Sequence, residues 1–301
     1  MLKMPRPVPN ELIVMRLLNL REVLSQQEKK NYKNLEKGFE GELKFDLLTE
    51  KLQNECFVLN GLLLEVNNSE FQIDTSIIFQ KTIYLIDVKN FEGDYYYENE
   101  KLYFANGDEA KDPLLQLRRC ESLFRQLLQK LGVHFHVEAY LVYINPELTL
   151  LQAPRSYPIV YPTQLNRFMQ KLNMVPSRLY ETHEKFANQL ISLHKTESLN
   201  TKLPRYNYDQ IPKRIICSSC CSCSLSVRRN KIVCKKCNHQ EEIELAVLRI
   251  VEEIKILFPN RKITTNEVYH WCKIIESKKM IGRILKKNFK QVGYGKWSYY
   301  E

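Results

Sequence analysis

The sequence lacks apolar segments of two kinds. No apolar run in its 301 residues approaches the roughly 20 residues that a helix needs to span a bilayer, which excludes a membrane anchor of that kind. Residues 1–9 contain two basic side chains and three prolines but no apolar stretch typical of a secretory signal. With 44% hydrophobic and 27% charged residues, we expect a soluble, cytoplasmic protein of two or three domains.

The first 212 residues also lack an excess of positive charge. They contain 26 Lys and Arg against 27 Asp and Glu, whereas residues 213–301 contain 19 against 8. The net charge of +10 therefore comes from the last 89 residues. A basic region attached to a near-neutral body suits binding to nucleic acid, and the alternative is a tail kept soluble by lysine.

The cysteines cannot all pair, because there are nine, and six of them lie within residues 217–237. Without a secretory signal, this clustering favours metal over disulfides. Two Cys-x2-Cys pairs, at Cys217 and Cys220 and at Cys234 and Cys237, provide four thiolates for a tetrahedral zinc ion. The 13 residues between the pairs predict the hairpin of a structural zinc ribbon. The alternative ligands are Cys221, Cys223 and His239.

A predicted β-hairpin within residues 72–89 brings two acidic residues together. The two segments are rich in β-branched and aromatic residues and are separated by a short turn. If Phe79 pairs with Thr82, Asp74 lies directly opposite Asp87. A register shifted by one residue would place the two acids on opposite faces of the sheet.

In that register, Asp74, Asp87 and Lys89 lie on one face of the sheet. Two carboxylates can hold a divalent cation that polarises a phosphate, and an ammonium can stabilise the charge that develops on it. The alternative is that both acids are ordinary polar residues on a half-buried sheet. That interpretation explains Asp87 poorly, because its apolar neighbours predict a central strand, where a carboxylate needs compensation.

The remaining patterns predict helices interleaved with strands, which indicates an α/β fold. Residues 10–37 have helical periodicity, and a second helix is expected at residues 36–52, with Glu42 beside its apolar stripe. Gly38 and Gly41 precede this acid, and a close approach of the helix backbone to a neighbour or to substrate would explain them. Further elements are expected as a strand pair at 95–106, an amphipathic helix from Pro113 with Gln116 in its first turn, a buried strand at 137–144, and helices at 163–172 and 177–194.

The C-terminal region predicts three helices followed by a hairpin, the order of a winged helix. The helices are expected at residues 241–258, from the capping box Thr264-x-x-Glu267 onward, and at 278–288. The expected nucleic-acid contacts on the third helix and the wing are Arg283, Lys286, Lys287, Lys290 and Lys296. We expect Trp297, Tyr299 and Tyr300 to belong to the core rather than to stack on bases.

These elements predict five parts of the chain. They are an N-terminal helical segment (1–35), a nuclease-like domain (36–194), a linker (195–212), a zinc ribbon (213–243) and a winged-helix-like basic domain (244–301).

Residues 36–131 resemble the nuclease-related domain (NERD), a branch of the PD-(D/E)xK nuclease superfamily. The matching stretches, in chain order, are GFEGE at 38–42, QID at 72–74, IDVKN at 86–90 with Gly93 just after, and Pro113 to Gln116. The resemblance implies a restriction-endonuclease-like core, a mixed sheet flanked by helices. It also implies that Asp74 and Asp87 bind Mg²⁺ or Mn²⁺ and that Lys89 is the catalytic lysine.

The same resemblance implies that Glu42 is a helical acid near the metal and that Gln116 supports the site from the next helix. One position departs from the family pattern, because Asp87 stands where the family usually has Glu, one methylene longer. The hypothesis from the sequence is a metal-dependent nuclease acting on double-stranded DNA. The alternatives are a non-catalytic DNA-binding or regulatory protein built on a nuclease-like scaffold, and an enzyme that acts on RNA.

Overall fold

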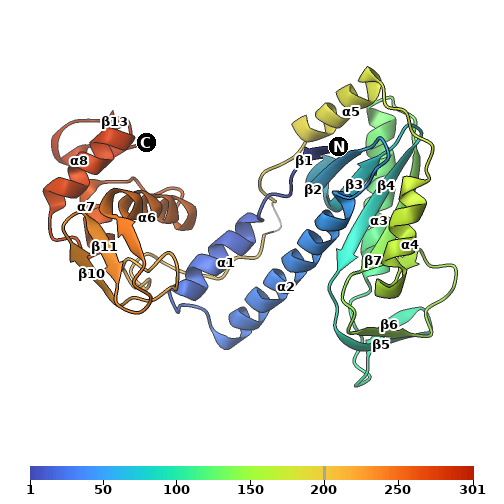
Figure 1. The fold of residues 1–301 in the computed structure, drawn as a ribbon, viewed down its shortest axis with the longest axis horizontal. Coiled ribbons are helices and arrows are strands. Elements are labelled where there is room, and N and C mark those ends of the chain that lie inside the picture. Colours follow the sequence, from blue (N-terminus) through green and yellow to red (C-terminus); the bar gives the residue numbers. More distant parts are fainter. Residues whose placement is uncertain (199–200) are drawn as a thin grey trace. The chain divides into compact units, whose positions relative to one another are not determined.

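The computed structural model describes residues 1–198 and 201–301, and of Lys296 only the backbone. The chain forms two compact units. The first consists of Met1–Asn10 and Lys33–Thr201, and the second of Glu11–Tyr32 and Lys202–Glu301. The segment expected as a separate N-terminal part, residues 1–35, is therefore divided between the two units (Figure 1).

The first unit is built on a mixed six-stranded sheet with the strand order β1-β2-β3-β4-β7-β9. The central pairs β2–β3 and β3–β4 are antiparallel, whereas β1, β7 and β9 each join the sheet in parallel. The bounds are β1 Leu2–Met4, β2 Phe57–Val66, β3 Ser69–Ile78, β4 Thr82–Lys89, β7 His136–Tyr143 and β9 Ile159–Val160. A mixed sheet was expected from the sequence, but the edge strand β1 was not.

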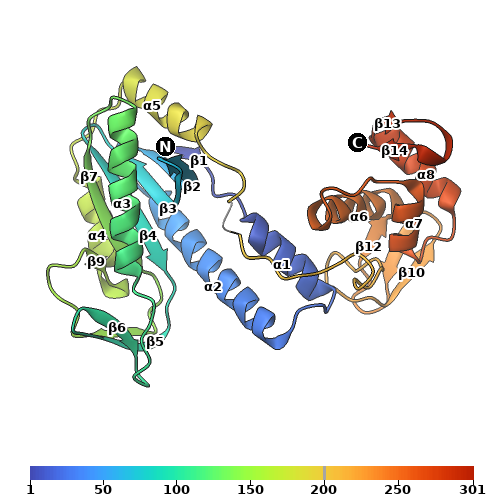
Figure 2. The ribbon, with the colours of Figure 1, turned by 180° about the vertical axis from the view of Figure 1, so that it is seen from behind.

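Helices cover both faces of this sheet (Figures 1 and 2). On one face α3 (Pro113–Lys130) and α5 (Glu181–Ser192) bury a stripe of Leu and Phe residues. On the other face, Phe45 of α2 (Gln26–Thr49) and Phe168 of α4 (Leu165–Asn173) pack onto the strands. The layered α/β arrangement predicted from the sequence is confirmed.

A second, smaller sheet extends the first unit with the order β6-β5-β8. Its strands are β5 Gly93–Glu98, β6 Lys101–Phe104 and β8 Leu148–Leu151, and a short 3₁₀ turn, Pro162–Gln164, precedes α4. The pair β5–β6 is antiparallel and corresponds to the strand pair expected at 95–106.

The prediction of one helix over residues 10–37 is wrong, because the structure has two helices there. The first, α1, spans Asn10–Leu20, and α2 then runs from Gln26 to Thr49. Ser25 and Glu28 form a reciprocal cap at the start of α2: the Ser25 N–H donates to the Glu28 carboxylate at 2.7 Å, and the Glu28 N–H donates to the Ser25 hydroxyl at 3.3 Å. This capping box is the local signal that separates the two helices.

The second unit combines a small antiparallel sheet with three helices and a terminal hairpin. Its elements after α1 are β10 Leu225–Arg228, β11 Lys231–Cys234, β12 Gln240–Glu242, α6 Ile243–Leu257, α7 Thr265–Cys272, α8 Lys278–Asn288, β13 Gln291–Val292, a 3₁₀ turn Gly295–Trp297 and β14 Tyr299–Tyr300. The Thr264 hydroxyl accepts a hydrogen bond from the Glu267 N–H and caps α7, as the sequence predicts.

The segment expected as a linker contributes to this second unit. Ile211 is buried, and the ring of Tyr208 lies 5.5 Å from that of Trp271, centroid to centroid. These residues therefore belong to the packed unit and do not form a free connection.

Candidate functional site

The register of strands β3 and β4 brings the two predicted acids together. The ladder pairs Ile78 with Ile83 and continues to Thr75 with Ile86, which is the register expected from the sequence. The next positions along the two strands are Asp74 and Asp87. The N–H of Val88, next to Asp87, donates to Asp74 Oδ2 at 2.9 Å, which fixes the first carboxylate against the second strand.

Both acids are buried within the sheet. Strand β4 is central, between β3 and β7, and Asp87 and Asp74 are only 7% and 8% exposed. Lys89 forms an ion pair with Asp87 Oδ1, and Gln72 donates to Asp74 Oδ1 at 3.4 Å. The structure therefore places the Asp87 carboxylate in a buried central strand. This is the position that the alternative of an ordinary polar residue explained poorly.

Helix α2 brings Glu42 to this pair of strands, and Arg6 holds it. The Arg6 guanidinium donates to Glu42 Oε2 at 2.7 Å and binds Asp46 with two further hydrogen bonds of 2.7 and 2.8 Å. It also reaches the Thr75 hydroxyl on β3 at 3.1 Å. Sequence reasoning missed Arg6. The available signal was the spacing of Glu42 and Asp46, since acids four residues apart share one face of a helix.

Burial, together with the crowding of negative charge, raises the pKa values of two carboxyl groups. Burial and the neighbouring Asp74 raise the pKa of Glu42 to about 8, although Arg6 and Lys89 act in the opposite direction. Burial and Asp74 likewise raise the pKa of Asp87 to about 7, against the effect of Lys89. For Lys89, burial alone would lower the pKa, but Asp87, Asp74 and Glu42 outweigh burial and raise it, so the ammonium stays charged.

This donor set fits a hard divalent cation. Its ligand atoms are carboxylate oxygens, which Mg²⁺ and Mn²⁺ prefer, and a second positive charge would relieve the repulsion that raises the two pKa values. Among the described residues, no three carboxylates approach one another closely enough to hold one ion as they stand. The Lys89 ammonium lies beside Asp87 instead, so a cation at Asp87 has to displace it.

A glycine allows helix α2 to approach the end of strand β4. A Cβ atom on Gly41 would lie 2.6 Å from Cβ of Asn90, the residue after Lys89. A Cβ on Gly38 would meet nothing within 4 Å. The expected close approach is therefore confirmed for Gly41 but not for Gly38.

A groove of about 470 Å³ adjoins the acids on the side of α3. Gln72 of β3 and Gln116, exposed in the first turn of α3, both line it, as do the cationic side chains of Lys111 and Arg119. The structure thus places Gln116 beside the strand that carries Asp74. Whether it supports the site, as the family resemblance implies, stays a prediction.

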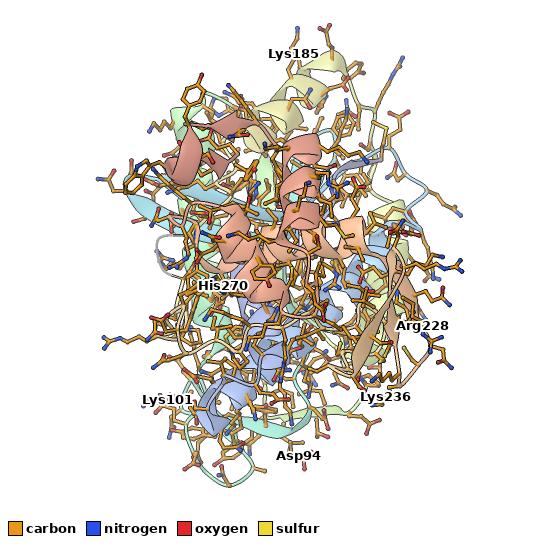
Figure 3. All side chains as sticks on the ribbon, turned by 90° about the vertical axis from the view of Figure 1, so that its left-hand side faces the viewer. Asp94, Lys101, Lys185, Arg228, Lys236 and His270 are labelled. Carbon is orange, nitrogen blue, oxygen red and sulfur yellow. The ribbon has the colours of Figure 1, made fainter. Side chains whose placement is uncertain are left out.

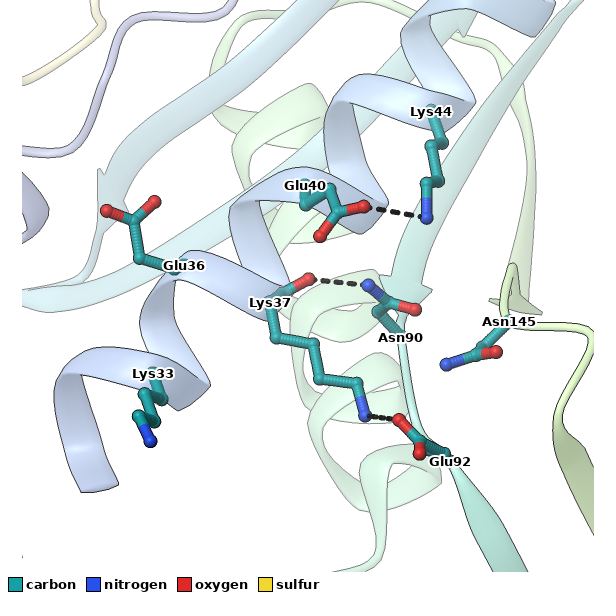
Figure 4. A pocket seen from close by; sticks show the side chains of 8 residues that line it. All are labelled: Lys33, Glu36, Lys37, Glu40, Lys44, Asn90, Glu92 and Asn145. Atoms are coloured by element: carbon teal, nitrogen blue, oxygen red, sulfur yellow. Dashed lines mark hydrogen bonds and ion pairs between the residues drawn. The ribbon is translucent and has the colours of Figure 1, made fainter. Parts of the chain in front are cut away.

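A second hollow, of about 460 Å³, lies along α2 (Figure 4). Most of the side chains that line it are charged, and several of them form ion pairs with one another. Glu40 and Lys44 form an ion pair of 2.9 Å, Lys37 pairs with Glu92, and the Lys37 carbonyl accepts from Asn90 at 2.7 Å. None of the predicted site acids lines this hollow.

In the second unit, four cysteines converge at one end of the small sheet. The Sγ atoms of Cys217, Cys220, Cys234 and Cys237 all lie within 4.8 Å of one another, and within the described part of the chain they are the one such group of possible metal ligands. Cys221 and Cys223 are exposed and stand outside the group, and His239 contacts Ser218 at 3.0 Å. The cluster can bind zinc. Arg228 and Lys236 extend from the same part of the chain (Figure 3).

The predicted basic contacts are exposed, with one qualification for Lys287. Arg283, Lys286 and Lys290 are exposed, while the exposed Lys287 forms a 2.8 Å ion pair with Glu244 of α6. The side chain of Lys296 lies outside the described residues. The assignment of Trp297 to the core is wrong, because 78% of its surface is exposed, whereas Tyr300 is buried as expected.

Comparison with known families gives one match. Residues 37–144 match the nuclease-related domain. That range contains Glu42, Asp74, Asp87, Lys89 and Gln116. Just over a third of the chain is covered, and the zinc-binding cluster and the C-terminal helices lie outside it. A nuclease-related domain suggests a nuclease-like function with nucleic acid as the substrate.

No curated protein matches the sequence. Among solved structures, protein VC1899 from Vibrio cholerae aligns with 12% identity and a TM-score of 0.27, over 55% of this chain and 52% of that one. Likeness at this level is too low to inform function. None of the described helices is long and apolar enough to cross a membrane.

Proposed function

We propose that this protein is a metal-dependent nuclease that hydrolyses DNA phosphodiester bonds with Mg²⁺ or Mn²⁺. The observation that carries the proposal is the cluster of Asp74, Asp87 and Lys89 on two adjacent central strands, inside the range that matches a nuclease-related domain. A buried acid with a raised pKa, here Asp87, beside a charged lysine is costly to maintain, and such arrangements concentrate at functional sites.

In this proposal Asp74 and Asp87 hold the cation, and Glu42 lies close enough to influence the charge of the site. A bound divalent ion would polarise the phosphate and lower the pKa of water. The Val88 N–H keeps Asp74 in place at 2.9 Å, and Arg6 keeps Glu42 turned toward the strands at 2.7 Å. Asp87 is one methylene shorter than the glutamate usual in the family, so its carboxylate reaches less far from the strand.

Lys89 serves as a permanent cation and not as a base. Its ammonium stays protonated because Asp87, Asp74 and Glu42 raise its pKa. Once released from Asp87, this charge stabilises the negative charge that accumulates on the phosphate in the transition state. The exposed cations Lys111 and Arg119 line the adjacent groove, where they can neutralise the phosphates that flank the scissile bond.

The second unit binds double-stranded DNA in this account. The four cysteines would hold a structural zinc in a ribbon formed by β10, β11 and β12. Helices α6 to α8 and the terminal hairpin form a winged-helix-like module, in which β14 also bridges Ile263. The exposed Arg283, Lys286 and Lys290 would contact phosphates, a role that suits the excess of positive charge in residues 213–301.

The test is cleavage of DNA by the purified full-length chain with Mg²⁺ or Mn²⁺. Wild type should cut DNA, whereas Asp87→Ala and Lys89→Ala should lose at least about 10²-fold in rate, the effect typical of a lost charge-stabilising group. Asp94→Asn is the matched control, since it removes an exposed carboxylate of β5 in the same unit and should cut like wild type. Equal cleavage by all four proteins, or none by wild type on any DNA, would refute the enzymatic proposal.

One observation favours the non-catalytic alternative. Lys89 occupies the place beside Asp87 that a cation would need, as expected if the nuclease-like fold serves only as a scaffold. In that case Mn²⁺ should not bind between Asp74 and Asp87, and the second unit should account for all DNA binding.

A further inference from the structure

The C-terminal hairpin (residues 290–301) exposes two aromatic rings at its tip. Tyr294 is 93% exposed and Trp297 is 78% exposed, the highest values of any aromatic side chain in the described part of the chain. Removing such rings from water is favourable, and aromatic residues held this openly are unusual in a chain whose other tryptophan is fully buried. The exposed pair therefore needs a functional explanation.

The base of the hairpin is anchored against the rest of the second unit. Strands β13 and β14 pair Gln291 with Tyr300, and the Tyr300 N–H donates to the Ile263 carbonyl at 2.8 Å. Tyr300 itself is only 5% exposed. Two glycines with φ of +79° and +62°, Gly293 and Gly295, form the turn between the strands, a conformation that glycine adopts without strain.

Positive charge lies at the base of the hairpin. Lys290 is exposed directly before β13, and Lys262 Nζ lies 4.6 Å from the ring centroid of Tyr299. The acid of this region is Glu301, which hydrogen-bonds to the Tyr299 hydroxyl. The hairpin belongs to the stretch of 89 residues that holds 19 basic and 8 acidic side chains. Its partner is expected to be anionic as well as planar and apolar, which describes a nucleic acid better than an apolar protein surface.

Stacking on the rings would also distinguish unpaired bases from an intact duplex. Bases inside a duplex are already stacked on one another, so their faces are closed to a side chain. Unpaired bases offer open faces, and each base stacked on an aromatic ring contributes about 1–3 kcal/mol. We propose that the C-terminal hairpin binds unpaired bases by stacking on Tyr294 and Trp297. The protein then prefers DNA with single-stranded tails, gaps or frayed ends over intact duplex.

This inference rests on the proposed nucleic-acid binding of the second unit, and it specifies the substrate class. The chain offers a direct optical test, because it has two tryptophans and only Trp297 is exposed, while Trp271 is completely buried. Full-length protein is titrated, without added Mg²⁺ or Mn²⁺, with a 20-nucleotide oligothymidylate, an oligouridylate of equal length and a blunt 20-bp duplex.

The single strands should quench tryptophan emission and protect it from acrylamide, and the duplex should do so far less. In Trp297→Phe the remaining emission should not respond to any of the three. The double variant Tyr294→Ala/Trp297→Ala should weaken single-strand binding about tenfold or more, as expected for lost stacking, and change duplex binding less than about twofold. Comparing the two single strands shows whether the preference is for DNA or for RNA.

Leu245→Ala is the matched control, since it removes another exposed apolar side chain of the same unit, on α6, and should leave all affinities unchanged. Thermal melting checks that the variants fold, which is expected because neither ring is buried. Duplex binding without quenching by either single strand would overturn this inference and leave the proposed nuclease intact. Absence of binding to all three nucleic acids would contradict both proposals.

Discussion

The side chain of Asp87 lies in a central strand, where most proteins place an apolar residue. Its carboxylate faces Asp74 on the next strand, and the repulsion between them contributes to the raised pKa of Asp87. Lys89 and Arg6, which lies in the segment after β1, supply the positive charges that make this arrangement tolerable. A chain selected only for stability would lose these charges, since apolar replacements of buried ion pairs are often neutral or stabilising. Their presence is best explained by chemistry at the site.

The pKa of Glu42 predicts a pH-dependent stability that can be measured. Its folded value of about 8 lies above the ordinary value of 4.5, so the folded chain binds a proton that the unfolded chain has released. Without a divalent cation at the acids, stability should fall as pH rises from about 5 to about 8. Glu42→Gln cannot ionise and should be more stable than wild type at pH 9, by on the order of 1–2 kcal/mol.

Urea denaturation of the two proteins at pH 5, 7 and 9 measures this difference. At pH 5 they should be nearly equal, because Glu42 is then protonated in the folded chain. A Gln variant that is less stable at pH 9 would show that the carboxylate is favourably ionised and that the charge balance described for the site is wrong.

Replacing the two glycines of α2 by alanine should change the stability of the first unit in opposite directions. Gly38→Ala adds a methyl group to open space and should stabilise the helix by about 1 kcal/mol. Gly41→Ala places a methyl group 2.6 Å from Asn90 Cβ and should destabilise the first unit by about 1–3 kcal/mol. It should also slow DNA cleavage, because Asn90 follows Lys89 directly. Changes of the same sign in the denaturation midpoint would contradict the close approach of helix and strand.

Among the elements, the features specified by local sequence could be predicted and the long-range ones could not. The short turn between β3 and β4 determines the register, so the sequence alone placed Asp74 opposite Asp87. Helices α3 and α8 were predicted closely because Pro113 and Ser277 mark where they begin. The break before α2 was also locally encoded, in Ser25 and Glu28, but the continuous apolar pattern concealed it.

Other parts of the site depend on contacts between distant segments. Strand β1 is three residues long and pairs in parallel with β2, more than 50 positions away. No local sequence pattern predicts this pairing. Arg6 follows it and reaches Glu42 and Asp46, 36 and 40 positions away. The exposure of Trp297 was missed for a related reason, since an aromatic residue beside a turn packs inward or outward according to its tertiary surroundings.

The cysteine cluster predicts that one zinc ion supports the folding of the second unit. Cys234→Ser should abolish stoichiometric zinc and lower the melting temperature of that unit, because structural zinc contributes directly to folding. Cys221→Ser is the matched control, since this neighbouring cysteine is exposed and stands outside the cluster, and it should retain one zinc per chain. Elemental analysis and calorimetry measure both properties. Loss of zinc from the Cys221 variant alone would show that the ligand set is wrong.

For the whole molecule, an N-terminal helix stabilises a unit formed mainly by the last hundred residues. Arg21, which follows α1, donates to both carboxylate oxygens of Glu253 on α6 at 2.7 Å and to the carbonyls of Pro212 and Arg214. The Arg21 and Glu253 side chains are 1% and 8% exposed. A fragment that begins at Lys202 lacks α1 and Arg21, so it is an incomplete second unit.

Removing one partner of this buried pair should destabilise the second unit strongly. Arg21→Ala leaves the Glu253 charge without compensation and should cost about 3–5 kcal/mol. The double variant Arg21→Met/Glu253→Leu should recover most of that loss, because it removes both charges together. Denaturation followed through the emission of the buried Trp271, whose ring lies 5.2 Å from the Arg21 guanidinium carbon, measures the effect. An unchanged midpoint in Arg21→Ala would contradict the role given to α1.

The central claim for the molecule is that Asp74 and Asp87 share a divalent cation. Anomalous scattering from a crystal of the protein soaked in Mn²⁺ measures this directly. We expect one manganese peak within coordination distance, about 2.0–2.6 Å, of an oxygen from each aspartate, with the Lys89 ammonium moved away from Asp87. Lys89 still paired with Asp87 and no manganese between the two aspartates at saturating concentration would contradict the account.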